Sequence, residues 1–349
     1  MIYGLIVSVI DTRFNCLPTM IGSLPHRNPR QACALIGHYL KDIPAWPQLP
    51  LLGPLESMVT QYGEGLPGLA MTDGKMSVDT TQDLNPGLTV IYEAFLEGNA
   101  EALPISPTCA AGLYELLTLN HLNPYAVKGQ VIGPISFGLS VRDSSGKAII
   151  YDDTLSDATA RLLHLKANWQ ETKLRQISSR TIIFVDEPGM TTYGSAFFNL
   201  PKEQVVALID ITLSGISGLK GIHCCGNTDW GLIVSTQADI LSLDAYNFGP
   251  SLALFPNDIT GFLERGGAVA WGIVPTNDAL AQESVASLKD RLEDAMAAFT
   301  RLGVPFARLK EQALLTPACG LAAFSEDGAE QALQLLAGLS ARMRGEAAP

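Results

Sequence analysis

The chain has 349 residues, of which 47% are hydrophobic and 17% charged, a composition that supports a large folded core and argues against disorder. Its formal net charge is −12 at pH 7, and no cluster of Lys or Arg is present, which excludes a general surface for nucleic acid or anionic membranes. The six cysteines are irregularly spaced and do not form the framework of a small secreted protein, so we expect reduced thiols and a cytoplasmic location.

Segment 1–10 is apolar apart from Ser8, but it is too short to span a bilayer and has neither a basic n-region nor a small-residue cleavage site. It is interpreted as an extra strand or an incorrectly assigned start. We therefore expect a single domain over 1–349, with 1–17 as an N-terminal extension.

From Pro18 onward, short apolar runs alternate with longer amphipathic segments, as in repeated βα units around a parallel sheet. The predicted strands are 19–23, 45–52, 127–132, 181–185, 221–225, 240–244, 268–273 and 313–316. The predicted helices include 156–179, 202–217, 284–302 and 328–344. Because each strand is nearly continuous in apolar residues, both of its faces should be buried, and the pattern predicts an α/β fold, a (β/α)8 TIM barrel. Segment 53–126 is rich in Pro and Gly and is interpreted as holding a long loop that caps the barrel mouth.

Chemically competent side chains gather where the predicted strands end. Active sites of such barrels lie at the C-terminal ends of the strands, which makes these residues candidates for function. They are Ser23, Asp186, Glu187, His223, Cys225, Asp244 and Cys319.

A zinc site is the chemistry that three of these residues indicate. His223 and Cys225 are two apart in a predicted strand and project to the same face, while Cys224 points away. A barrel would bring Cys319 beside them, after the last predicted strand. Zinc accepts His nitrogen and Cys sulfur, and a catalytic site keeps one position open, where a thiol is deprotonated to a nucleophilic thiolate. The alternatives are buried cysteines that act as small hydrophobes and a structural zinc with Asp244 as fourth ligand.

The segment Met-Ile-Gly-Ser-Leu-Pro at 20–25 and Asp-Glu-Pro at 186–188 resemble motifs of the catalytic barrel of cobalamin-independent methionine synthase. That family belongs to the superfamily of uroporphyrinogen decarboxylase and the corrinoid:coenzyme M methyltransferases. The resemblance implies that Ile21, Gly22 and Ser23 hold the carboxylate of homocysteine and that Asp186 contacts its ammonium group.

The segments His-Cys-Cys at 223–225 and Pro-Ala-Cys-Gly-Leu at 317–321 are similar to the zinc-binding segments of the same family. The resemblance implies that His223, Cys225 and Cys319 are zinc ligands. It also implies that Asp244, at the position of an exchangeable Glu ligand, is the fourth, and that the product is methionine.

The sequence departs from the family where the folate donor would bind. The stretch 270–276 has Val274 about where the family has a His that protonates the folate leaving group. Segment 132–140 lacks the Trp that would form the expected aromatic platform, and Thr192 or a neighbour stands where a folate-contacting Glu is found. The N-terminal half of a full-length folate-using enzyme is also missing.

A methyl-corrinoid donor accounts for these losses, because cob(I)alamin leaves without a proton and needs no general acid. We therefore expect a corrinoid carrier protein as partner, docking at the barrel mouth, and no nucleic-acid or membrane partner.

The acceptor is less constrained by the sequence. Homocysteine is favoured, and coenzyme M is the main competitor, although its sulfonate would need cationic partners. A family Glu that contacts the ammonium group is missing from 46–54, and Gln48 or Glu56 would substitute for it. A decarboxylase without metal would need an Arg-rich cleft, and few Arg lie near the predicted strand ends. His26 follows segment 20–25 and could reach the substrate, but solvent exposure on a loop is the default interpretation. His38, His121 and His164 are interpreted as surface residues.

Overall fold

The structure is a computed structural model that describes residues 11–72, 74–119, 122–196 and 198–347; the strand considered for 1–10 and the placement of His121 fall outside these residues. Its centre is a seven-stranded parallel sheet in the order β1-β10-β9-β8-β7-β6-β4. The strands are β1 (Leu17–Pro18), β4 (Val127–Ile132), β6 (Thr181–Asp186), β7 (Leu219–Cys224), β8 (Ile240–Leu243), β9 (Ala268–Val274) and β10 (Ala313–Pro317). From β4 onward, the six strands match the predicted ranges to within two residues at each end.

Two irregular segments close the sheet into a barrel. Ser23 forms a parallel bridge with Gln48, and Ala45 forms one with Lys128 of β4. The backbone amide of Gln48 donates to the Gly22 carbonyl at 3.0 Å. Segments 22–24 and 44–48 therefore fill the gap between β1 and β4, and the seven strands plus segment 44–48 complete the predicted (β/α)8 barrel.

The predicted strands 19–23 and 45–52 are wrong in extent. Regular pairing at the first ends with β1, just before residue 19, and within 19–23 only Ser23 forms an isolated bridge. In the second, residues Pro50–Leu52 form a 3-10 helix instead. Pro47 and Pro50 interrupt the second segment, and proline cannot donate to a hydrogen-bond ladder, so only isolated bridges form there.

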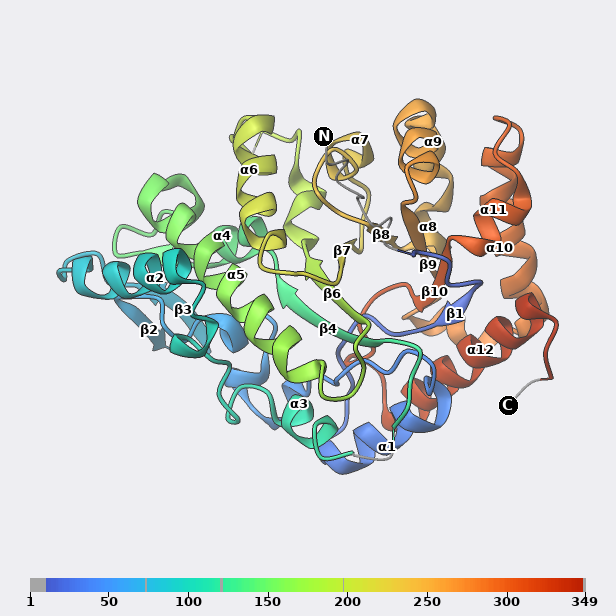
Figure 1. The fold of residues 1–349 in the computed structure, drawn as a ribbon, viewed down its shortest axis with the longest axis horizontal. Helices are drawn as coiled ribbons and strands as arrows, with labels where there is room; N and C mark the ends of the chain where they lie inside the picture. The colour runs from blue at the N-terminus through green and yellow to red at the C-terminus, as the bar shows by residue number, and fades with distance from the viewer. Residues whose placement is uncertain (1–10, 73, 120–121, 197, 348–349) are drawn as a thin grey trace, which may run out of the picture.

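The helices lie around the outside of the curved sheet (Figure 1). They are α1 (Pro29–Tyr39), α2 (Asn85–Glu97), α3 (Ala111–Leu116), α4 (Pro134–Ser140), α5 (Asp153–Leu174), α6 (Lys202–Leu213), α7 (Trp230–Ile233), α8 (Ala245–Phe248), α9 (Pro256–Glu264), α10 (Val285–Thr300), α11 (Phe306–Glu311) and α12 (Glu326–Arg344). The sequence marks their ends: α12 starts where the Ser325 side chain accepts from the Gly328 amide, and it stops at Gly345, whose φ is 75°.

Segment 53–126 contains regular structure rather than one long loop. It includes the 3-10 helices Pro54–Glu56 and Thr60–Tyr62, the helices α2 and α3, and the antiparallel pair β2 (Leu69–Thr72) and β3 (Lys75–Val78), which β5 (Arg142–Asp143) joins in a small second sheet. Its proposed role as a cap over the barrel mouth stays a prediction.

Two groups of buried apolar side chains account for the fold. The larger group packs the helices against the outer face of the sheet. The smaller group fills the barrel near the starts of the strands and contains Phe14, Ile43, Ala126, Ile182, Phe184, Leu219, Ile240, Ala268, Ala270 and Leu314. The strand starts are therefore a packed core, and the candidate site residues lie at the other end.

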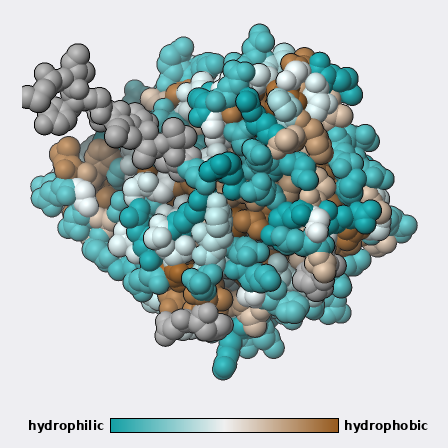
Figure 2. All heavy atoms as spheres, turned by 45° about the vertical axis from the view of Figure 1, so that its right-hand side comes forward, coloured by the Kyte–Doolittle hydropathy of each residue, from teal (hydrophilic) through white to brown (hydrophobic). Residues whose placement is uncertain are grey.

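The surface in Figure 2 is mostly hydrophilic, with smaller apolar areas between the polar side chains. Among the described residues, no helix combines the length and the apolar character needed to cross a membrane.

Candidate metal centre

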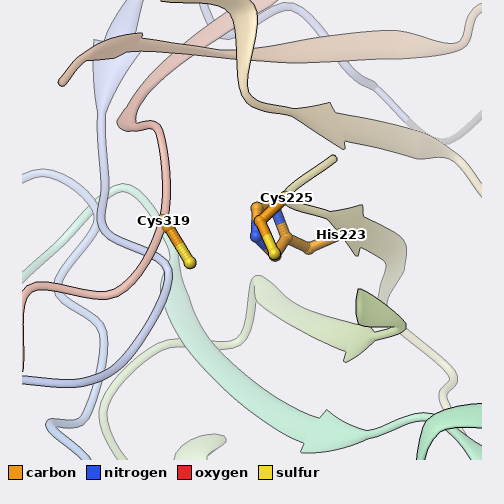
Figure 3. Close-up of side chains that lie close together, drawn as sticks. All are labelled: His223, Cys225 and Cys319. Carbon is orange, nitrogen blue, oxygen red and sulfur yellow. The ribbon is translucent and has the colours of Figure 1, made fainter. Parts of the chain in front are cut away.

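Three soft ligand atoms converge at the C-terminal end of the barrel. The ligand atoms of His223, Cys225 and Cys319 all lie within 4.8 Å of one another. His223 is in β7 and Cys225 follows the end of that strand, while Cys319 comes from the loop after β10. Figure 3 shows its sulfur directed toward the other two side chains. The barrel thus brings together the three residues that the sequence identified.

The His223 ring is oriented for coordination. Its Nδ1 lies 3.0 Å from the Ser242 hydroxyl on the neighbouring strand β8, and its Nε2 is buried without a hydrogen-bond partner. A buried polar atom without a partner is costly. If Nδ1 carries the proton and donates to Ser242, Nε2 is left with a free lone pair that faces the two sulfurs, as in metal-binding histidines. The donor set of one imidazole and two thiols therefore fits zinc.

The two thiols differ in their environment. The pKa of Cys225 is lowered, chiefly because Cys319 donates a hydrogen bond to its sulfur. The pKa of Cys319 is raised by the same hydrogen bond and by burial. After the first thiol loses its proton, the remaining proton is therefore shared between the two sulfurs, and a bound cation would favour the state in which both are thiolates.

A local irregularity helps to place Cys319. The pairing of β10 with β9 shifts register between Thr316 and Pro317, so that Pro317 lies opposite Val274. A bulge bends the strand that contains it, and here the bend precedes the loop that carries Cys319. The next residue but one in the chain, Leu321, donates its amide to the Ser23 carbonyl at 2.9 Å, which ties this loop to the first segment of the barrel.

The three candidate ligands line a cavity of about 400 Å³. Its wall includes most of the predicted substrate-binding residues, and no arginine is among its described lining residues. The lining is Ile21, Ser23, Gln48, Pro50, Glu56, Ser57, Met58, Asp186, Pro188, His223, Cys225, Cys319, Gly320, Ala322 and Ala323. A larger cavity of about 740 Å³ lies at the opposite end of the barrel, beside Asn15 and Glu311, and contains none of the predicted site residues.

Asp186 is an unpaired acid in this cavity. It is 3% exposed, and its Oδ1 has no hydrogen-bond partner. Burial raises its pKa, while the nearby charges of His223 and Lys128 act in the opposite direction. A cationic group of a ligand would satisfy this oxygen.

Glu187, the next residue, has a different environment. Its carboxylate accepts hydrogen bonds from the amides of Ile135 and Ser136 at 2.9 and 2.8 Å and from the Ser136 hydroxyl at 2.5 Å. These groups belong to the first turn of α4, so Glu187 stabilises the start of that helix. Burial raises its pKa to about 7 despite these hydrogen bonds.

Gln48 is held by a buried network. Its Nε2 donates to Gln61 Oε1 at 2.7 Å, and Gln61 in turn donates to the Cys109 carbonyl. Because a carbonyl can only accept, the network fixes the Gln48 amide with its Nε2 toward Gln61. Glu56 is held by the Ala111 amide at 2.6 Å and by Gln61 at 3.3 Å.

Asp244 lies directly after β8, as predicted, and caps α8. Its oxygens accept from the amide and the side chain of Asn247 at 2.9 and 2.7 Å. It does not belong to the group of ligand atoms within 4.8 Å of one another, so its role as a fourth ligand stays a prediction.

The sequence predicts solvent exposure for the other histidines. For His26 this is wrong: it is 6% exposed, and its Nδ1 is buried without a partner, because it follows the buried turn that reaches the barrel mouth. His38 is exposed and His164 is half-buried.

Sequence reasoning did not identify Ser242 and Lys128. Both had a signal in the sequence: Ser242 is two residues before Asp244 on the same strand face, and Lys128 is the charged residue of a strand whose other residues are uncharged.

Comparison with known proteins gives a structural likeness only. No protein-family model matches the sequence, and no protein with a curated description matches it significantly. Among solved structures, a B12-independent methionine synthase from Shewanella sp. W3-18-1, in complex with selenomethionine, aligns with a TM-score of 0.60 and 15% identity over 94% of this chain and 98% of the other. The chain has the fold of that methionine synthase. A methyltransferase from Methanosarcina mazei aligns with a TM-score of 0.57 and 13% identity, over 95% and 94% of the two chains. These two structures confirm the predicted methionine synthase-like barrel.

Proposed function

We propose that the chain is a zinc-dependent methyltransferase that transfers a methyl group to the sulfur of a thiol, with homocysteine as acceptor and methionine as product. The observation that carries this proposal is that one imidazole and two thiols converge on a cavity whose wall also contains Asp186, a buried acid with an oxygen that has no hydrogen-bond partner. A thiol amino acid has one group for each: a sulfur for the metal and an ammonium for the acid.

His223, Cys225 and Cys319 would hold the zinc ion, and three protein ligands leave a position free toward the cavity. Bound zinc lowers the pKa of a coordinated thiol, so that the acceptor is present as a thiolate at neutral pH. Asp186 would bind the ammonium group of the acceptor, and the turn at 21–23 its carboxylate. These contacts orient the sulfur relative to the donor.

A methyl-corrinoid on a carrier protein is the proposed donor. The bond between cobalt and the methyl carbon breaks with its electron pair left on cobalt, the carbon–sulfur bond forms, and the thiol proton goes to solvent. This transfer needs no general acid. The described residues of the cavity wall include no histidine besides His223 and no tryptophan. Val274, about where the family has its protonating His, is fully buried. Both observations fit a donor that needs neither a general acid nor an aromatic platform.

The test is methyl transfer by zinc-loaded protein from methylcobalamin to homocysteine, followed by the absorbance of cob(I)alamin, with coenzyme M assayed in parallel. Turnover with homocysteine alone supports the proposal, and turnover only with coenzyme M assigns a different acceptor. Activity with methyltetrahydrofolate and without a corrinoid contradicts the proposed donor. The variant C319A should be inactive, whereas C224A should retain activity, because Cys224 is buried in the outer core.

A structural zinc is the alternative outside catalysis. X-ray absorption of the zinc-loaded protein separates the two cases: addition of homocysteine should add one sulfur to the zinc coordination. An unchanged coordination shell would identify a closed, structural site.

A further inference from the structure

Lys128 is a buried cation beneath the candidate site. It lies on β4, is 0% exposed, and points into the barrel. Its Nζ donates to the Ile21 carbonyl at 2.6 Å and to Gln130 Oε1 at 3.1 Å, and it lies 4.4 Å from the centre of the Phe184 ring. The three hydrogens of the ammonium group are thus directed at two neutral oxygens and an aromatic face.

This charge has no close acidic partner. Among the described residues, Lys128 takes part in none of the ion pairs within 4.0 Å. A buried cation without an ion pair is costly. Burial lowers the pKa of Lys128 to about 7, and the acid whose charge opposes this shift is Asp186, which lies on the adjacent strand β6 and lines the cavity.

The residue whose carbonyl accepts from Lys128 lines the cavity. Ile21 lines the cavity, as does Ser23 two residues later. The intervening Gly22 is tightly packed, because a Cβ there would lie 2.6 Å from Gln48 Oε1 and 3.0 Å from Gln130 Cδ. The turn 21–23 is therefore fixed from below by the Lys128 ammonium and has little room to shift.

We propose that Lys128 is a positioning residue for the thiol acceptor: it holds the turn 21–23 against the cavity and provides the positive charge that balances Asp186. This inference rests on the proposed function, because it assumes that the turn and Asp186 bind the charged groups of an amino-acid thiol. Lys128 itself does not line the cavity and is assigned no contact with substrate.

The chain offers a matched control in Lys166. It is also 0% exposed, and its Nζ donates to a backbone carbonyl, that of Pro104, at 2.6 Å. Pro104 does not line the metal-site cavity. K128M and K166M thus remove the same kind of interaction, one beneath the site and one remote from it.

The experiment measures thiol binding without any methyl donor. Wild type, K128M, K128Q and K166M are loaded with Co²⁺, and the thiolate-to-cobalt absorbance is titrated with homocysteine and with ethanethiol, which lacks both charged groups. K128M should bind homocysteine about 10-fold or more weakly, the loss typical of a charged hydrogen bond. Its affinity for ethanethiol, and the affinities of K166M for both thiols, should stay within about 3-fold of wild type by the same scale. K128Q replaces K128M if the latter does not fold.

Homocysteine affinity unchanged in K128M and K128Q overturns the inference, and an equal loss for both thiols does so as well, because it indicates general distortion of the site. If the wild type shows no response to either thiol, the proposed function fails, and this inference fails with it. A response in wild type that K128M retains contradicts only the role of Lys128.

Discussion

At the scale of single residues, the candidate site depends on which ring nitrogen of the His223 imidazole carries the proton. The Ser242 hydroxyl is the group that decides which nitrogen of His223 faces the sulfurs, because it lies 3.0 Å from Nδ1. Ser242 is not one of the three candidate ligands. The site therefore extends at least one residue beyond the three ligands that the sequence reveals.

We expect S242A to weaken zinc binding by about 10-fold or more, since loss of a partner of a metal-binding histidine typically costs 10- to 100-fold in affinity. Competition with a chromophoric chelator measures the change. T316V is a suitable control: Thr316 is fully buried in β10, and its hydroxyl has no hydrogen-bond partner. Equal zinc affinities for S242A and wild type would show that Ser242 does not orient the ring.

Two adjacent acids should separate stability from binding. Glu187 receives three hydrogen bonds, so E187A should lower the free energy of unfolding by about 3 kcal/mol. Asp186 has a buried oxygen without a hydrogen-bond partner, so D186N should lower stability less than E187A does, while it weakens homocysteine binding. Urea unfolding and the cobalt titration give the two quantities. Loss of stability in D186N equal to that in E187A would contradict this division of roles.

At the scale of secondary-structure elements, the sequence predicts the later strands well because they are short, continuously apolar runs between amphipathic helices. It fails at 45–52, where Pro47 and Pro50 leave the apolar pattern intact but remove the donors of a ladder. The site shows the same limit. Ligand residues could be predicted because their type reveals their chemistry. The partner of Gln48 comes from the 3-10 helix Thr60–Tyr62 and that of His223 from strand β8, and both depend on tertiary placement, which the sequence does not display.

Lys166 of helix α5 provides a pH-dependent test of how that helix packs its charged side chain in the core. Burial lowers the pKa of Lys166 from 10.5 to about 8. Between these two pH values the folded chain binds fewer protons at this site than the unfolded chain, so the free energy of unfolding rises with pH. Relative to K166M, the stability of wild type should increase by about 2 to 3 kcal/mol from pH 8 to pH 10.5. A difference between the two proteins that is independent of pH would show that Lys166 titrates normally.

At the scale of the whole molecule, the candidate metal centre connects distant parts of the chain. Cys225 follows β7 and Cys319 follows β10, and these strands are separated in the sheet by β8 and β9. The loop with Cys319 is also tied to the first barrel segment through the Leu321 amide. The barrel closes there through isolated bridges rather than a regular ladder, so the mouth is held together by few backbone contacts.

Zinc should therefore stabilise the entire barrel. An ion that binds only the folded chain raises its stability by about 2.7 kcal/mol at a free concentration 100 times its dissociation constant. The melting temperature of the wild type should rise with buffered free zinc, whereas C319A should not respond, and C224A should respond like wild type. The increase should continue with the logarithm of zinc concentration above saturation, which distinguishes specific binding from a general effect of the salt. A zinc response that persists in C319A would place the stabilising ion elsewhere and contradict the assignment of Cys319 as a ligand.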